Sequence, residues 1–246
     1  MRRYQNARAE VKEKCPLVSV IIPVFNGEQY LREAIESVLS QSYRSIDIVV
    51  VDDGSTDNSA RVAKSFTPQV RYVYQENSGL SAALNRGIEV SRGSFLAFLD
   101  SDDLWEKDKL THQMSVFEDN PDLDIVFGQV KQFFSPELDE NHRKRLHIPA
   151  EVMPGISKCS MLIKRDSFSR VGAFERKWKV GDFIDWYLRA IEKGLKSVVL
   201  DEIVSHRRIH GNNMGIRERK SQTDYVRMLK ASLDRRRSAA GEDPVE

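Results

Sequence analysis

The sequence has little of what would mark several common protein classes. Its two cysteines, Cys15 and Cys159, are too few and too scattered for a disulfide framework or a zinc site. No apolar run reaches the length of a membrane span, and the charged N-terminus lacks the apolar core of a secretory signal. Neither sign of charge is in excess: 38 Lys and Arg stand against 37 Asp and Glu. That balance does not favour a nucleic-acid-binding protein, and we expect a cytoplasmic protein with free thiols.

Internal repeats and low-complexity linkers are also missing, so nothing divides the chain into several similar units. Its 246 residues suffice for one large domain or for one domain with an appendage. We expect an N-terminal extension over residues 1–16, one domain over 17–214 and a basic helical tail over 215–246. Within the domain, the pattern is regular over 17–105 and looser over 106–214.

Buried strands alternate with amphipathic helices in the first hundred residues. Continuous apolar, β-branched runs predict strands within 17–24, 46–55, 70–77 and 94–100. Apolar residues at helical spacing predict helices within 30–39, 55–66 and 79–93. This alternation predicts an α/β fold in which helices flank a mostly parallel central sheet.

The second half carries weaker signals. They predict helices near 107–118 and 184–196, a strand over 124–134, a strand and a short helix within 158–174, one or two strands over 197–210, and a helix within 217–237. The polar segment 135–155 contains prolines and a basic cluster at 142–147. We expect it to form a long loop, of the kind that is often functional or mobile.

Acidic side chains gather where two of the predicted strands end. Asp52 and Asp53 follow the second strand, and Asp100, Asp102 and Asp103 follow the fourth. Ligands of parallel α/β sheets bind at the carboxyl ends of the strands. Carboxylates there suit Mg²⁺ or Mn²⁺, and further aspartates can accept hydrogen bonds from a ribose or a base. The alternative, a simple turn after each strand, is weakened because two strand ends share the feature.

Four segments resemble, in the same order, the motifs of family 2 glycosyltransferases with a GT-A fold. They read VSVIIPVFNGEQYLREAIESVLSQSY, DIVVVDDGSTDNS, ENSGLSAALNRGIEVSRGSFLAFLDSDD and GDFIDWYLRAIEKG. The resemblance extends from about Leu17 to Met214. It implies a Rossmann-like GT-A domain, a nucleotide-diphosphate sugar donor, Mn²⁺ or Mg²⁺, and inversion by direct displacement. Residues 17–105 would then bind the donor and residues 106–214 the acceptor.

The resemblance also implies roles for individual donor-binding residues. Pro23, Phe25 and Glu28 would wall the nucleotide pocket, and Asp53 would accept the N3–H of a uracil-type base. Asp102 and Asp103 would approach the metal and the ribose, with Asp100 in support and the direct ligand left open. Arg86 would contact the diphosphate, unless it is a solvated arginine on a helix face.

The transfer needs a base for the acceptor hydroxyl, and a positioned carboxylate can serve. The family carries an acidic pair, usually Glu-Asp, before an aromatic-rich helix; here Gly181 replaces the Glu and Asp182 aligns with the base. Asp185 is the nearest competitor, as a helix N-terminal charge or an acceptor-binding group. Trp178 and Trp186 flank this segment and can stack on a sugar acceptor, although a place in the core is favoured for Trp186.

A basic segment near the end of the domain, SHRRIHGNNMG, can serve the leaving diphosphate. His210 would complete the metal shell, and Arg207 or Arg208 would face the phosphates, while a structural histidine is the alternative. The basic cluster 142–147 and the Arg-rich tail are most simply solvated surface. The other interpretation is attraction to anionic lipids, with peripheral binding at the inner membrane face, useful for a lipid-linked acceptor.

Rival functions are distinguished by where the charges lie. A phosphate-receiver domain has its acidic pair after the first strand, whereas this pair follows the second. A nucleotidyltransferase needs a glycine-rich basic loop after the first strand, and PVFNGEQY has one glycine and no Lys or Arg. A sugar-nucleotide-binding protein without catalysis remains an alternative. We therefore predict a metal-dependent inverting glycosyltransferase that uses a UDP-type donor and a glycan or lipid-linked acceptor.

Overall fold

The computed structural model describes residues 15–145, 152–178, 180–211, 213 and 223–240. Most of the expected N-terminal extension lies outside these residues, as do positions 146 and 147 of the basic cluster and positions 214–222 before the tail helix. No helix in the described ranges is both long and apolar enough to cross a membrane.

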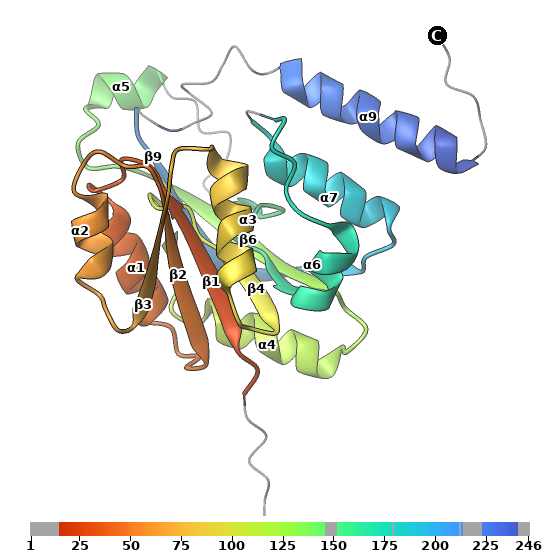
Figure 1. The fold of residues 1–246 in the computed structure, drawn as a ribbon, viewed down its shortest axis with the longest axis horizontal. Coiled ribbons are helices and arrows are strands. Elements are labelled where there is room, and N and C mark those ends of the chain that lie inside the picture. Colours follow the sequence, from red (N-terminus) through yellow and green to blue (C-terminus); the bar gives the residue numbers. More distant parts are fainter. Residues whose placement is uncertain (1–14, 146–151, 179, 212, 214–222, 241–246) are drawn as a thin grey trace, which may run out of the picture.

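The first half of the chain forms the parallel part of the sheet. Its strands are β1 (Val18–Val24), β2 (Ile46–Asp53), β3 (Val70–Gln75) and β4 (Phe95–Phe98), and they pair side by side in the order β3-β2-β1-β4. The intervening helices are α1 (Leu31–Leu39), α2 (Ser59–Lys64) and α3 (Leu80–Val90). The alternation predicted from the sequence is confirmed here, and it brings the carboxyl ends of β1, β2 and β4 to one edge (Figure 1).

The second half extends the same sheet with mixed pairing. Its strands are β5 (Leu104–Trp105), β6 (Ile125–Phe134), β7 (Val152–Pro154), β8 (Leu162–Lys164) and β9 (Ser197–Ile209). Antiparallel β8 joins β4 to β6, β9 runs parallel to β6, and β5 and β7 pair antiparallel with β9 and β6. The result is one nine-stranded sheet in order β3-β2-β1-β4-β8-β6-β9-β5, with β7 beside β6.

The described residues of this half also form the helices α4 (Lys109–Asp119), α5 (Glu140–Arg145), α6 (Arg165–Val171), α7 (Asp182–Glu192) and α9 (Thr223–Ala240). The expectation of a structureless loop over 135–155 was wrong, because the segment contains α5 and β7. Both are too short, at six and three residues, to show a periodic apolar pattern. Helix α7 also starts two residues before its predicted range, and Gly194, at φ +71°, follows its end.

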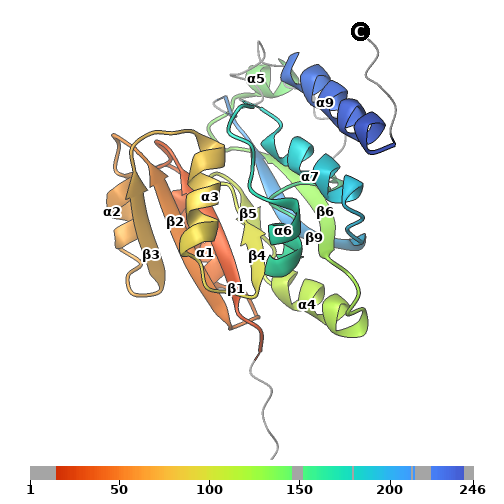
Figure 2. The same cartoon turned by 45° about the vertical axis from the view of Figure 1, so that its right-hand side comes forward.

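Alternating side chains of β1 supply both faces of the core. Val18, Val20 and Ile22 pack in a cluster with α1, α2 and α4, whereas Ile21 faces a second cluster with α3, α6 and α7. A continuously apolar strand is therefore buried on both sides, as expected of a strand between two helical layers. Figure 2 shows α3, α6 and α7 on one side of the sheet, with α9 lying outside α7.

Helix α9 is held on α7 by a buried apolar side chain, by hydrogen bonds and by ion pairs. Met228 is fully buried beneath it. Arg235 donates to both carboxylate oxygens of Glu192, at 2.7 and 3.1 Å, and Ser232 donates to the same carboxylate at 2.6 Å. The predicted helical C-terminal extension is thus present, and it packs against the helix that begins at Asp182.

Candidate active site

The loops after β1 and β2 are joined by hydrogen bonds between their polar side chains and backbones. The N–H of Asn26, a residue at φ +51°, donates to Ser55 Oγ at 3.0 Å, and Asn26 Oδ1 accepts from the N–H of Thr56 at 2.8 Å. Glu28 Oε2 accepts from both the backbone and side-chain nitrogens of Asn58, at 2.8 and 2.7 Å. The small polar residues of FNGE and GSTDNS therefore fix this edge of the sheet.

A cavity of about 730 Å³ opens at this edge. Of the predicted site residues, it is lined by Pro23, Phe25, Asp53, Asp100, Asp102, Asp103, Trp178, Asp182 and Arg207. Lys158, Arg176 and Asn213 also line it, and the sequence offered no signal for them. One cavity therefore brings together the strand-end carboxylates and the segment before α7, which lie some eighty positions apart in the chain.

The two aspartates at the end of β2 are buried and already hydrogen-bonded. Asp52 accepts from the Ser55 N–H at 2.8 Å and from the Tyr72 hydroxyl at 2.7 Å. Asp53 accepts from Gln75 Nε2 at 2.7 Å and from the N–H groups of Ser78 and Gly79 at 2.8 and 2.9 Å. Since a carboxylate has about four accepting positions, Asp53 retains roughly one for a ligand.

The turn that follows β4, Asp100–Asp103, is called here the carboxylate turn. The Asp103 N–H donates to the Asp100 carbonyl at 3.1 Å, which closes the turn. Arg208 holds it from β9: its backbone N–H donates to Asp103 Oδ1 at 2.9 Å, and its Nε donates to the Asp102 carbonyl at 2.9 Å. The pairing of β5 with β9 thus fixes how the carboxylates project.

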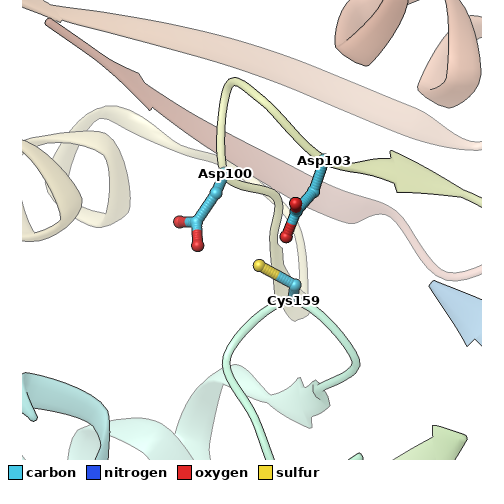
Figure 3. A group of neighbouring side chains, drawn as sticks. All are labelled: Asp100, Asp103 and Cys159. Atoms are coloured by element: carbon cyan, nitrogen blue, oxygen red, sulfur yellow. The ribbon is translucent and has the colours of Figure 1, made fainter. Parts of the chain in front are cut away.

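The carboxylate turn fits a divalent cation. Asp100, Asp103 and Cys159 each offer a ligand atom, and these atoms lie within 4.8 Å of one another (Figure 3). Burial, together with the charges of Asp102 and Asp100, raises the pKa of Asp103 well above its ordinary value. A dication would relieve that repulsion, and carboxylate oxygens suit Mg²⁺ or Mn²⁺. The sequence did not indicate Cys159, whose thiol pKa is also raised by burial and by the two aspartates.

His210 approaches Asp102, the other predicted metal ligand of the turn. His210 Nε2 lies 2.9 Å from Asp102 Oδ2, and Asn213 Nδ2 lies 3.4 Å from the same oxygen. The histidine ring is largely buried and packs against Tyr30, with ring centroids 5.0 Å apart. His210 thus orients Asp102 directly, although it does not line the cavity among the described residues.

Three predicted donor-binding residues lie elsewhere. Glu28 accepts hydrogen bonds from Asn58 at the start of α2, and it is absent from the described cavity wall. Arg86 pairs with Glu89 at 2.6 Å across one turn of α3 and is absent from the wall of this cavity, so its contact with the diphosphate stays a prediction. Arg208 is buried, donates to Glu33 at 2.7 Å and stacks on Tyr30, so it stabilises the carboxylate turn. Arg207 is the arginine that faces the cavity.

Asp182 is the first residue of α7 and lines the cavity. Its Oδ2 is buried and accepts no hydrogen bond from the described part of the chain. The Lys158 ammonium lies 4.0 Å from Oδ2 and 3.1 Å from Asp100 Oδ1. A carboxylate at a helix N-terminus, facing a cavity and without a donor, is free to bind a substrate hydroxyl.

The tentative acceptor roles of Asp185 and Trp186 are not supported by their positions. Asp185 is fully buried and accepts from Arg189 Nε at 3.0 Å. Trp186 is fully buried, stacks on Phe168 and donates its indole N–H to the Gly172 carbonyl at 2.8 Å. Trp178 differs, because it lines the cavity and its buried indole N–H has no acceptor among the described residues.

Gly181 stands where the family resemblance led us to expect a glutamate, and its backbone gives a local reason for glycine. Its φ of +80° is left-handed, a conformation that strains other residues. A Cβ built there would lie 2.8 Å from Met228 Cε and 2.9 Å from Tyr225 Cε1. Helix α9 therefore fills the space that a side chain at position 181 would take.

A model of the protein family described as glycosyl transferase family 2 matches residues 19–186. The chain belongs to this family. An uncharacterized glycosyltransferase of Rickettsia typhi is 33% identical over 208 residues, which are 79% of this chain and 64% of the relative. The glycosyltransferase GlyG of Streptococcus pneumoniae is 40% identical over 116 residues, 46% of this chain and 38% of that protein. The chain thus spans less than two thirds of these relatives.

Two solved structures share the fold. S. aureus TarS residues 1–349 in complex with UDP-GlcNAc superposes with a TM-score of 0.67 at 19% identity, covering 81% of this chain and 60% of that one. The mannosyltransferase PcManGT of Pyrobaculum calidifontis, in complex with GDP-Man and Mn²⁺, gives a TM-score of 0.59 at 19% identity over 81% and 59%. The predicted family and GT-A fold are therefore confirmed.

Proposed function

We propose that this family 2 protein is a metal-dependent inverting glycosyltransferase that moves a sugar from a UDP-type donor to a hydroxyl of a glycan or lipid-linked acceptor. The observation that carries the proposal is the single cavity in which the carboxylate turn faces Asp182. A donor-side charge cluster and the Asp182 carboxylate in the same cavity suit attack of a hydroxyl on a sugar carbon bound beside them.

The donor would be bound at the β1, β2 and β4 edge of the cavity. Phe25, half-exposed on the cavity wall, offers a flat apolar surface for a base, and Asp53 keeps an accepting position for a base N–H. Arg207 supplies a cation for the diphosphate. UDP-GlcNAc in the TarS complex is consistent with a UDP-type donor, through fold similarity alone.

Mn²⁺ or Mg²⁺ would be held at the carboxylate turn by Asp103 and Asp100, whose oxygens lie close together, with Asp102, oriented by His210, as a further predicted ligand. The cation would stabilise the charge that grows on the leaving diphosphate. Asp182 would accept the proton of the acceptor hydroxyl through its free Oδ2. The unpaired indole N–H of Trp178 would donate to an acceptor oxygen on the same wall.

Binding and catalysis are tested separately, because the alternative is a sugar-nucleotide-binding protein without catalysis. A panel of nucleotide sugars is screened for Mn²⁺-dependent thermal stabilisation, and the best donor is then used in a transfer assay. Asp182→Asn should lower kcat for transfer by about 10²- to 10⁴-fold and leave the thermal shift intact, while Asp201→Asn, an exposed aspartate outside the cavity wall, should change neither. Full transfer by Asp182→Asn would exclude this base, and a panel without any shift would exclude the donor class.

Helix α9 supports peripheral contact with an anionic membrane surface. Val226, Leu229 and Leu233 are 69, 55 and 52% exposed and lie together on the side of α9 away from Met228. Lys230 and Arg236 flank this stripe, which is the pattern of an interfacial amphipathic helix. Leu229→Glu with Leu233→Glu should abolish sedimentation with anionic vesicles; equal sedimentation of the variant, or of the wild type with neutral vesicles, would contradict this docking.

A further inference from the structure

Lys158 is a buried cation on the wall of the active-site cavity. Only 8% of its side chain is exposed, and its Nζ lies between Asp100 of the carboxylate turn and Asp182 at the start of α7. The distances are 3.1 Å to Asp100 Oδ1 and 4.0 Å to Asp182 Oδ2. It is the residue that links the donor side of the cavity to the candidate base.

The segment that carries Lys158 is fixed by its backbone. The Met161 N–H donates to the Lys158 carbonyl at 3.2 Å, and the Ser160 hydroxyl donates to the Ser157 carbonyl at 3.1 Å. Just before it, Gly155 packs so tightly on β6 that a Cβ would lie 2.2 Å from the Gly128 carbonyl oxygen. The ammonium is therefore presented from a rigid turn.

An ammonium at this depth requires compensation by opposite charge. Burial opposes the charged form, and the carboxylates of Asp100 and Asp182, at 3.1 and 4.0 Å, supply the opposite charge. Removing one member of a buried charged group leaves the others uncompensated. Asp182 Oδ2 and Asp100 Oδ1 are both buried without a hydrogen-bond donor among the described residues, so both carboxylates depend on the charge of Lys158.

We propose that Lys158 is a positioning residue that holds the Asp182 carboxylate toward the cavity and at a fixed separation from the carboxylate turn. The inference rests on the proposed role of Asp182 as base. Its consequence is that Lys158 sets the distance between the group that takes the proton and the groups that hold the donor. A displacement of about 1 Å in such an arrangement can reduce the rate by about 10²-fold.

The test compares Lys158→Met, Lys158→Gln and Lys158→Arg with the wild type. We expect the two neutral variants to lower kcat by about 10- to 100-fold, with the donor KM and the Kd of UDP within about twofold of the wild type. Lys158→Arg, which keeps the charge in a different shape, should recover part of the loss. The matched control is Lys109→Met, which removes another buried lysine whose Nζ binds the Ser160 carbonyl at 2.9 Å. It should leave kcat unchanged.

A double-mutant cycle tests whether Lys158 acts through the base. Adding Lys158→Gln to Asp182→Asn should cause no further loss of kcat, because the group that it positions is already gone. Multiplying losses would overturn the inference, as would equal losses in Lys158→Gln and Lys109→Met. If Lys158→Gln keeps the wild-type kcat while Asp182→Asn loses activity, the role of Lys158 is refuted and the proposed base stands. Wild-type kcat in Asp182→Asn would instead refute the proposed base.

Lys158→Gln keeps a polar side chain with a hydrogen-bond donor, although it is one atom shorter than lysine, so the test survives if Lys158→Met does not fold. Its fold is checked by thermal unfolding and by UDP binding. If neither neutral variant folds, Lys158→Arg becomes the deciding variant. The inference then requires a reduced kcat at unchanged UDP affinity, and a wild-type kcat would overturn it.

Discussion

Lys109 gives the protein a measurable pH dependence of stability. The side chain is fully buried, and its Nζ donates to Gln113 Oε1 at 2.6 Å and to the Ser160 carbonyl at 2.9 Å. Both partners are neutral, and the ring of Trp105 lies 4.7 Å from the nitrogen. Burial therefore lowers the pKa of Lys109 from 10.5 to about 7, so that a neutral amine serves the same two hydrogen bonds.

The sign of the effect follows from proton linkage. Between pH 7 and 10 the unfolded chain keeps this lysine protonated while the folded chain releases the proton, so the free energy of unfolding rises with pH. With pKa values of about 7 folded and 10.5 unfolded, the gain from pH 7 to pH 9 is about 2 kcal/mol. Lys109→Met removes the group, so the mutant should lack this gain whatever its absolute stability.

Urea unfolding at pH 7, 8 and 9 measures the gain, because other titrating groups are the same in both proteins and cancel in the comparison. The free energy of the wild type relative to Lys109→Met should rise by about 2 kcal/mol over this range. Lys193→Met serves as control, because Lys193 is exposed at the end of α7 and should leave the pH dependence unchanged. Parallel pH curves for the wild type and Lys109→Met would refute the neutral buried amine.

Three other changes have expected outcomes. Asp103→Asn should raise the Tm of the metal-free protein, because the repulsion that raises its pKa disappears, and should abolish Mn²⁺-induced stabilisation in thermal scans. Gly181→Glu should lower the free energy of unfolding in urea by about 2 kcal/mol or more, from its left-handed φ and the contact with Met228. Trp186→Ala should cost about 3–5 kcal/mol in the same measurement, because the ring is core. Unchanged values would contradict each assignment.

The donor side of the site could be predicted because its signals are local. The apolar runs of β1, β2 and β4 need no distant partner to be recognised, and parallel pairing brings their carboxyl ends together automatically. Asp53, Asp100 and Asp103 therefore reach one cavity as expected. The same logic fails for α5 and β7, whose formation depends on neighbours in the fold rather than on their own pattern.

Charged residues were harder to assign because their use depends on distant partners. Arg208 was a candidate for the phosphates, but a buried guanidinium with Glu33 and the Asp102 carbonyl as partners serves the fold. Arg207, the preceding residue, faces the cavity. Successive side chains of β9 point to opposite faces of the sheet, and this alternation gives the two arginines different roles. Lys158 had no signal at all, since nothing in KCSML indicates that Asp100 and Asp182 converge on its nitrogen.

The base side of the site combines two sequence departures that only the fold connects. Gly181 stands where the family resemblance led us to expect a glutamate, and α9 lies beyond the segment that carries the family resemblance. In space they meet: Met228 and Tyr225 occupy the volume above Gly181, and Arg235 joins α9 to Glu192 at the other end of α7. The position of Asp182 therefore depends on the packing of α9 against Gly181 and on the charge of Lys158. Loss of either contact should displace the Asp182 carboxylate.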